Sequence, residues 1–331
     1  MSKIKQVFLI TLIVCIGKIS NAQFTTTGGN ITQSTSGNVG IGVLTPTIPL
    51  SLLEVKNGSV LFDGYLGSTP ISGVGARMMW IPAKRAFRAG EISGTQWDDA
   101  NIGMTSFASG INTTASGQYS TAMGGQTTAS GSYSCAIGFT TISSGSYSNS
   151  FGFYTNAQGY YSSSFGQRTT AQSYNSFVIG RFNVNPGTYS TTTWVSTEPL
   201  FVIGNGTSAT VRNNALTVLK NGNVLIDKAT QINSTYKLDV NGKIRASEIV
   251  VNTTGADFVF EKSYTLMPLD LLEQKIKADK HLPEIASAEE MQTNGVGLSE
   301  LNTKLLQKTE ELTLYIIELN KRIEILENKN K

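Results

Sequence analysis

The chain has 331 residues, of which 33 are glycine and 15% are charged, with 26 basic and 23 acidic side chains and one histidine. This composition departs from that of an ordinary globular enzyme towards a β architecture rich in small residues. The near balance of charge excludes the strong basic field that concentrates nucleic acid or anionic lipid, so neither is expected as a partner.

Residues 1–22 have the features of a secretory signal peptide. Two lysines precede an apolar run at 7–16, and small residues precede a cut ahead of Gln23. Its removal takes away three lysines and no acid, which leaves 23 basic and 23 acidic residues. The run is too short to span a bilayer, so we expect no integral membrane segment in the mature chain. We predict a secreted, extracellular or cell-surface protein whose one mature cysteine, Cys135, has no disulfide partner.

Two looser patterns flank the centre of the chain, one on each side. Apolar residues alternate and end in Asn-Gly, which predicts strands closed by hairpin-type turns. We assign 23–76 to an N-terminal β stalk and 190–256 to a β-rich shaft. Segments 216–224 and 238–244 resemble the shaft modules of phage tail-fibre-like surface proteins. The pattern occupies residues 37–42 and 53–58 before the centre, and residues 222–227 and 238–242 after it.

Residues 77–102 interrupt these patterns with bulky side chains, including Trp80 and Trp97. A solenoid needs its first coil covered, so we predict that this block is a cap. A ligand-binding role for the tryptophans is the alternative. Asp98 and Asp99 could hold an ion, although a solvated turn is the simpler interpretation.

A 14-residue repeat dominates residues 103–189, and repeats of this kind predict a solenoid. Glycine recurs in two columns, and we expect these glycines to supply the positive φ values of tight turns. Between them run a threonine column and a column of small residues. The first glycine column is Gly110, Gly124, Gly138, Gly152, Gly166 and Gly180, the second is Gly103, Gly117, Gly131, Gly145 and Gly159, and the threonines are Thr113, Thr127, Thr141, Thr155 and Thr169.

Each repeat predicts two short strands that stack on the next coil at about 4.8 Å. In the first strand the third position is small, as at Ala136, and the fourth is larger and apolar, as at Ile137, Phe151 and Phe165. Adjacent strand residues face opposite ways, so both faces carry residues fit for burial. A narrow coil has one inside, and we therefore predict that the second face packs against other copies of the chain.

Two residue columns are candidates for partner binding. The tyrosines Tyr119, Tyr133, Tyr147 and Tyr161 close successive repeats, and they either form an exposed aromatic ladder that grips a partner or cover neighbouring coils. The threonine column raises ice binding as a second alternative, if its hydroxyls face outward in a regular array.

The repeats, such as residues 134–138 followed by a small-residue half ending in Gly145, resemble the head repeats of the YadA-like trimeric autotransporter adhesins. The resemblance covers 103–189 and implies a left-handed parallel β-roll, three chains side by side, and an adhesive head that binds an unknown host matrix or cell-surface ligand. Those adhesins end in a membrane β-barrel anchor, whereas this sequence ends in a charged helical pattern.

Residues 257–297 resemble the C-terminal segment of tail-fibre-like proteins related to the endosialidase intramolecular chaperone, peptidase family S74. That family cuts itself with a Ser and Lys pair at a Ser-Asp junction, and residues 253–258 lack this junction. A self-cleaving tail-fibre-like protein is therefore the first alternative function, and a trimerising role for the segment survives the missing junction.

From residue 298 to 331 leucine recurs every seven residues, which predicts a coiled coil. Isoleucine at a with leucine at d favours a dimer, but polar Asn302 and Thr309 at a blunt this preference. The trimer implied by the roll decides the stoichiometry. The residues predicted to trimerise are Leu305, Leu312, Ile316, Leu319, Ile323 and Leu326.

No constellation for catalysis is present in the sequence. A single histidine, His281, cannot assemble a metal site or a Ser-His-Asp triad alone, and residues 104–187 contain no Asp or Glu that could bind calcium. We therefore predict no enzyme activity, no cofactor and no metal. The predicted fold is mainly β: a homotrimeric fibre with a β-roll head, β-rich stalk modules and a C-terminal coiled coil.

Overall fold

The computed structural model describes residues 39–41, 53–55 and 59–329. The predicted signal peptide lies outside these residues. The chain divides into two compact units, residues 1–242 and 243–331, and each is described by itself.

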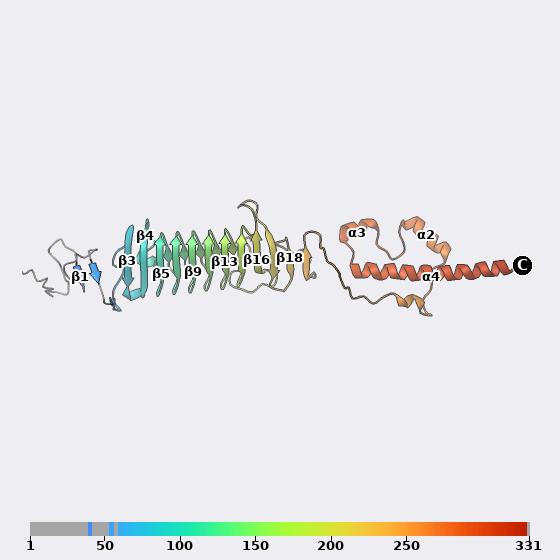
Figure 1. Ribbon diagram of the computed structural model, residues 1–331, viewed down its shortest axis with the longest axis horizontal. Coiled ribbons are helices and arrows are strands. Elements are labelled where there is room, and N and C mark those ends of the chain that lie inside the picture. The colour runs from blue at the N-terminus through green and yellow to red at the C-terminus, as the bar shows by residue number, and fades with distance from the viewer. Residues whose placement is uncertain (1–38, 42–52, 56–58, 330–331) are drawn as a thin grey trace, which may run out of the picture. The chain divides into compact units, whose positions relative to one another are not determined.

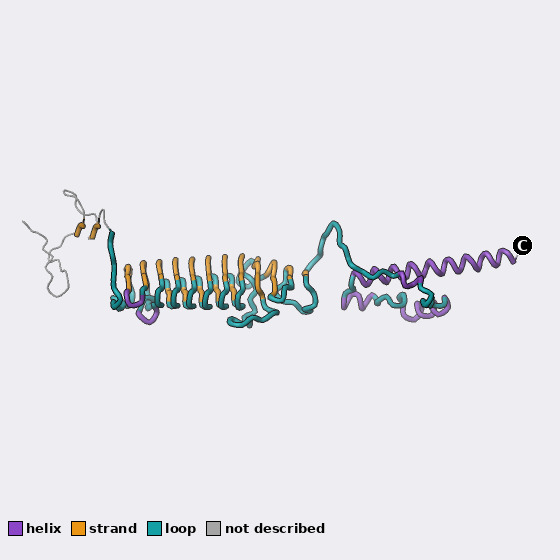
Figure 2. The backbone as a smooth tube through the Cα atoms, turned by 90° about the horizontal axis from the view of Figure 1, so that it is seen from below, coloured by secondary structure: helices purple, strands orange, loops and turns teal. Residues whose placement is uncertain are grey.

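The first unit is a parallel β-solenoid (Figures 1 and 2). Its long sheet has 12 strands, and its short sheet has five. The long sheet contains β3 (Gly75–Ile81), β4 (Ala86–Ile92), β5 (Phe107–Ile111), β7 (Thr121–Gly125), β9 (Cys135–Phe139), β11 (Asn149–Phe153), β13 (Ser163–Gln167), β15 (Phe177–Arg181), β16 (Pro199–Asn205), β17 (Asn214–Leu219), β18 (Val224–Ile226) and β19 (Leu238–Val240). The short sheet contains β6 (Thr114–Ala115), β8 (Thr128–Ala129), β10 (Ile142–Ser143), β12 (Asn156–Ala157) and β14 (Thr170–Ala171).

The coils stack in register, so each residue of β9 pairs with the residue 14 positions later in β11. The small third position of each repeat, counted from Ser106 in the first repeat, is the second residue of its long strand. It faces the inside and is buried, from Ala108 to Val178. Residues of the short strands, such as Ala115, close the core from the other side. The coil is thus too narrow for large side chains, which explains why the third position is small in every repeat.

Close approach of successive coils constrains both glycine columns, and the first column also has a positive φ. Gly138, within β9, has a φ of 132°, and a Cβ added there would lie 2.0 Å from the carbonyl oxygen of Gly152. Gly131 lacks a positive φ, and a Cβ added there would lie 2.0 Å from the carbonyl oxygen of Gly145. The prediction that both columns supply positive φ is therefore wrong for the second column, where close approach of successive coils excludes any side chain. The left-handed turn positions are instead occupied by residues such as Tyr133 and Gln126.

The N-terminal end of the roll is closed by an antiparallel pair, β3 and β4, in which β4 pairs in parallel with β5. A 3-10 turn, η1 (Pro82–Lys84), joins the pair, and η2 (Asp99–Asn101) follows β4. Trp97 is fully buried and its Nε1 donates to the Thr113 carbonyl at 2.8 Å. Arg88 is also fully buried, and its guanidinium donates to Ser106 and to the Ala115 carbonyl. Burial lowers the pKa of Arg88 to about 10.

The long sheet continues past residue 189, because β16 pairs in parallel with β15. Where β16 begins and β17 ends, a buried ion pair lies beside Ser173: Lys220 Nζ lies 3.2 Å from Glu198 Oε2 and donates to Ser173 Oγ at 2.6 Å. Ser173 stands where the second glycine column breaks. Burial is the largest influence on Lys220 and lowers its pKa.

The strands of the two flanking patterns pair differently from the prediction. β17 and β18 form a hairpin around Asn221-Gly222, but β18 and β19 pair in parallel, with Val224 opposite Leu238. β1 (Val39–Ile41) and β2 (Leu53–Val55) also pair in parallel, with Val39 opposite Leu53. Each parallel pair is offset by 14 residues, like the coils of the roll, so the prediction of hairpin-type closure is wrong for these two pairs.

The second unit is helical. It contains η3 (Asp257–Phe260), α2 (Leu269–Asp279), α3 (Ala288–Asn294) and the long α4 (Leu298–Lys329). Ser287 and Glu290 form a capping box at the start of α3. The segment before α4 folds back along it: Val259 is buried, Tyr315 donates to the Met267 carbonyl at 2.5 Å, and Ser299 donates to the Asn252 carbonyl at 3.1 Å. No helix of the described residues is both long enough and apolar enough to cross a membrane.

Candidate functional site: the outer surfaces of the roll and a helical groove

The outward face of the long sheet is apolar. The fourth position of each repeat, which includes Ile137, Phe151 and Phe165, lies on this face, and these three side chains are only half-buried. Phe151 stacks on Phe165 with ring centroids 5.0 Å apart, and Phe139 stacks on Phe153 at 5.7 Å. An exposed apolar surface of this kind marks an interaction site.

The four predicted binding tyrosines form a continuous ladder. The centroid distances are 4.7, 4.8 and 4.9 Å from Tyr119 through Tyr133 and Tyr147 to Tyr161, and the rings lie within 20° of parallel. Each backbone is left-handed, with φ between 57° and 59°, and each side chain is 41–48% exposed. The structure therefore brings all four together at one corner of the roll, where ring edges and hydroxyls meet solvent.

The threonine column does not form an outward hydroxyl array. Thr113, Thr127, Thr141, Thr155 and Thr169 are at most 1% exposed and line the inside of the coil. The outward column of the short sheet is mixed, with Ile142 and Asn156 between threonines. The arrangement on which the ice-binding alternative depended is therefore not provided by this column.

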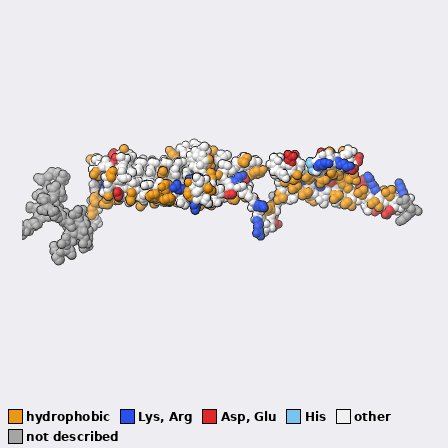
Figure 3. Space-filling view, turned by 90° about the horizontal axis from the view of Figure 1, so that it is seen from above, with side chains coloured by type: hydrophobic (Ala, Val, Ile, Leu, Met, Phe, Trp, Pro, Cys, Tyr) orange, Lys and Arg blue, Asp and Glu red, His pale blue; other side chains and the backbone are white. Residues whose placement is uncertain are grey.

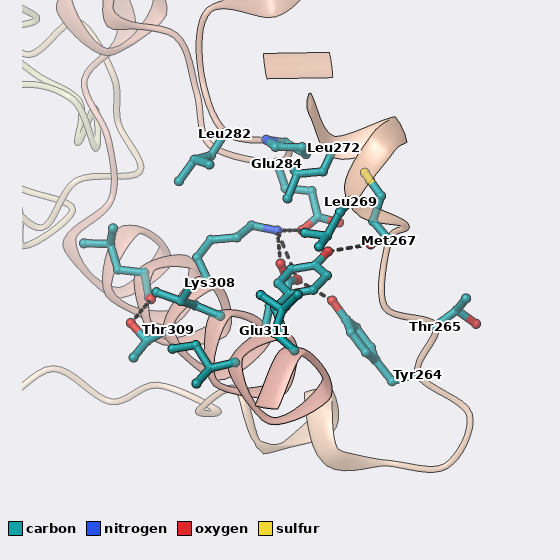
Figure 4. Close-up of a pocket in the computed structure, with 16 residues that line it drawn as sticks. Tyr264, Thr265, Met267, Leu269, Leu272, Leu282, Glu284, Lys308, Thr309 and Glu311 are labelled. Carbon is teal, nitrogen blue, oxygen red and sulfur yellow. Dashed lines mark hydrogen bonds and ion pairs between the residues drawn. The ribbon is translucent and has the colours of Figure 1, made fainter. Parts of the chain in front are cut away.

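The second unit contains an apolar groove of about 580 Å³ between α4 and an arm that runs from Tyr264 to Glu284 (Figure 4). The arm contributes Leu269, Leu272 and Leu282, and α4 contributes Leu305, Leu312, Ile316 and Leu319. Four of the six predicted trimerisation residues thus line the groove. All six are 44–59% exposed. These six residues, the seam of α4, are therefore not covered by the rest of the described chain.

A polar cluster fastens the arm to α4 at one side of this groove. Lys308 Nζ lies 3.0 Å from Glu284 and 3.1 Å from Glu311 (Figure 4). Gln307 also donates to Glu284 at 2.7 Å. Tyr264 donates its hydroxyl to Glu311. The hydrogen bond from Lys308, more than any other contact, lowers the pKa of Glu284 below its usual 4.5.

We expect the arm to loosen in acid. Because the folded pKa of Glu284 is depressed, its contribution is present above pH 4.5 and is lost as the pH falls through the lowered value. The side chain is 59% exposed, so the contribution is below about 1 kcal/mol. Amide protection of residues 264–284 should fall on acidification, and Glu284→Gln should remove most of that change. A pH response that persists in Glu284→Gln would contradict this assignment.

The contacts of the remaining candidate residues are those of residues that stabilise the fold. Trp97 is buried in the cap and Asp99 bonds Thr69 and Lys84, while Trp80 is 38% exposed. Cys135 is a free thiol whose pKa is raised by burial, opposite to the shift of a nucleophile. Within residues 59–329 no group of three His, Cys, Asp or Glu side chains is placed to hold a metal, and His281 Nδ1 contacts the adjacent Leu282 carbonyl at 3.0 Å.

Sequence reasoning missed the groove and the buried ion pair. The arm has no periodic pattern from which its contact with α4 could be predicted. The ion pair could not be predicted because Glu198 and Lys220 are 22 residues apart and belong to no repeat. Sequence reasoning also missed a cluster of three arginines at the C-terminal end of the roll, namely Arg168, Arg181 and Arg212. The sequence gives only a weak indication of it, because Arg168 and Arg181 stand in a stretch, residues 104–187, that has no other charge.

A family model described as the YadA head domain repeat matches residues 115–141 in two copies. No curated protein and no solved structure matches the chain. The matched repeats belong to a solenoid whose coils share one 14-residue spacing. The chain therefore carries a YadA-like β-roll head.

Proposed function

We propose that the mature chain is a secreted or cell-surface trimeric fibre that acts as an adhesin or structural surface protein and binds through its head. The observation that carries the proposal is the apolar outward face of the roll together with its exposed tyrosine ladder. Heads of the YadA type belong to trimeric surface adhesins, which supports both the stoichiometry and the location. The proposal includes no enzyme activity and no cofactor.

The trimer would cover two separate apolar surfaces. In the roll, the outward face of the long sheet would pack against the same face of two neighbours. In the helical unit, the exposed apolar residues of α4 from the three chains would pack against one another and form a coiled coil. Three identical heads would then raise weak single contacts to useful avidity.

The tyrosine ladder is the proposed contact surface for the host matrix or cell-surface ligand. Replacing Tyr133 and Tyr147 by asparagine tests this, because asparagine tolerates the left-handed backbone that both positions adopt. We expect retention on immobilised matrix proteins and on host cells to fall at least ten-fold, since truncation of buried aromatic anchors costs about 2 kcal/mol or more each. The measurement is binding of the full mature chain to a panel of such surfaces.

A matched control replaces Gln126 and Thr140 by asparagine, at the left-handed turn column of the same coils. Retention should be unchanged in this control. Equal loss in both variants, with native circular dichroism, would remove the ladder from the proposal. If the parent chain is retained on none of the surfaces, adhesion to those ligands is excluded and only the structural role remains.

The two alternatives have separate tests. A self-cleaving tail-fibre-like protein predicts a chain shortened near residue 255 after purification, which intact mass would reveal. Ice binding predicts thermal hysteresis in a freezing assay. No observation on the described residues favours either over the trimeric fibre.

A further inference from the structure

Three arginines meet at the C-terminal end of the roll. The guanidinium carbons of Arg181 and Arg212 lie 5.2 and 6.0 Å from the centroid of the Phe182 ring. Arg212 donates from one nitrogen to the Arg168 carbonyl at 3.3 Å and the Asn183 carbonyl at 3.0 Å. Gln167 pairs with Arg181 across adjacent coils, which places Arg168 on the neighbouring rung. The three side chains thus share one small surface.

This surface has no compensating acid among residues 59–329. No carboxylate there lies within 4.0 Å of any of the three guanidinium groups. Asp227, in the following turn, accepts from Asn213 at 2.6 Å instead. Arg168 and Arg181 are the only charged residues between 104 and 187. Clustered like charges repel, and an anion from outside the chain would relieve that repulsion.

Most of the donors remain available. A guanidinium has five N–H donors in a planar fork that matches sulphate and carboxylate oxygens. Arg181 donates to one carbonyl, that of Thr207 at 2.9 Å, and Arg212 uses one nitrogen for its two carbonyls. Arg181 and Arg212 are exposed and Arg168 is half-buried.

Aromatic rings lie beside the arginines. The Arg168 guanidinium is 4.2 Å from the centroid of Tyr154, which fixes its position. Tyr154 packs edge-on against Phe153 at 4.6 Å and Phe139 at 6.1 Å, and all three rings are 37–42% exposed. In Figure 3 a few Lys or Arg side chains lie beside a hydrophobic patch on the second half of the roll. Cations next to exposed rings suit a ligand with charged groups and apolar faces.

We propose that Arg168, Arg181 and Arg212, together with Tyr154, bind an anionic polysaccharide. Its sulphate or carboxylate groups contact the guanidinium forks while the apolar face of a sugar ring lies against Tyr154. A neighbouring subunit does not supply the anion, because in a parallel homotrimer each neighbour presents the same arginines at the same height along the roll. The inference rests on the proposed function, since three such patches on one trimer supply the avidity that a repeating polymer needs.

The test uses the full mature chain and heparin as the probe, with binding followed by calorimetry across a salt series. Arg168→Gln, Arg181→Gln and Arg212→Gln together should lower heparin affinity at least ten-fold and reduce the slope of log K against log salt by roughly three. Tyr154→Asn keeps the left-handed turn and should weaken heparin binding while leaving that slope unchanged. The matched control removes three exposed cations elsewhere, with Lys243→Gln, Arg245→Gln and Lys262→Gln, and should bind heparin like the parent chain.

Three outcomes would overturn the inference: no heparin binding by the parent chain, equal loss in both triple variants, or single-stranded DNA or polyglutamate bound as tightly as heparin. The native mass of each sample separates this inference from the proposed function. A trimer that ignores heparin refutes the patch alone, whereas a monomer that binds heparin through these arginines refutes the trimer and keeps the patch.

Discussion

Gly131→Ala should unfold or severely destabilise the roll, with a loss of more than about 4 kcal/mol in the free energy of unfolding. The added methyl would lie 2.0 Å from the Gly145 carbonyl oxygen, 2.5 Å from the Gly145 carbonyl carbon and 3.0 Å from the Ser144 carbonyl oxygen, all backbone atoms of the next coil. The Gly145 carbonyl accepts from the Ser148 N–H and the Gly145 N–H donates to the Ala157 carbonyl of the following coil, so this peptide cannot move without breaking those bonds. Chemical denaturation of the mature chain, followed by circular dichroism, measures the effect.

Two further alanine variants separate contact from backbone strain. Gly187→Ala has a positive φ of 77° and open space around the new methyl, so it should cost about 1–3 kcal/mol. Gly297→Ala has neither constraint and should change stability by less than about 0.5 kcal/mol. If Gly131→Ala unfolds like Gly297→Ala, the coils are not stacked as closely as described.

Phe151→Asp combined with Phe165→Asp should dissociate the proposed trimer. Both rings lie on the outward face of the long sheet, stacked 5.0 Å apart, and in a trimer each substitution occurs three times. Burying an unpaired carboxylate costs several kcal/mol, so six of them exceed what the interface can offset. We expect a monomer at micromolar concentration, measured by light scattering, with the circular dichroism of the roll retained.

The matched control places the same charges on the other outward face. Asn156→Asp and Thr170→Asp lie on adjacent rungs of the short sheet and are half-exposed, so they introduce the same repulsion between rungs. This variant should keep the native mass of the parent chain. A trimer that survives the Phe151 and Phe165 changes would show that the long sheet is not its interface.

The roll could be predicted from sequence because its constraints repeat. One fixed period places Ala108, Ala122 and Ala136 in the same environment, so the inward column and the outward apolar column follow from strand alternation alone. The tyrosine ladder follows equally, because stacked coils bring Tyr133 and Tyr147 to 4.8 Å. These features need no knowledge of contacts distant in sequence.

The ends of the roll and the helical arm could not be predicted in this way. Arg88 occupies an inward position next to Ala108, where the repeat gives no reason for a charge, and it is held by the Ser106 and Ala115 carbonyls of the first coil. The reason for Gly131 was also misjudged, since the sequence does not distinguish a positive φ from a close approach. The arm packs on α4 through isolated contacts, such as Tyr315 with Met267, that no periodic pattern encodes.

The native mass of the mature chain, residues 23–331, determined by light scattering together with the denatured mass of the same sample, tests the central claim. The account predicts three full-length chains in one particle, with the outward face of the roll and the seam of α4 covered. A monomer would contradict it, because the apolar face of the long sheet and the exposed leucines of α4 would then have no partner copy.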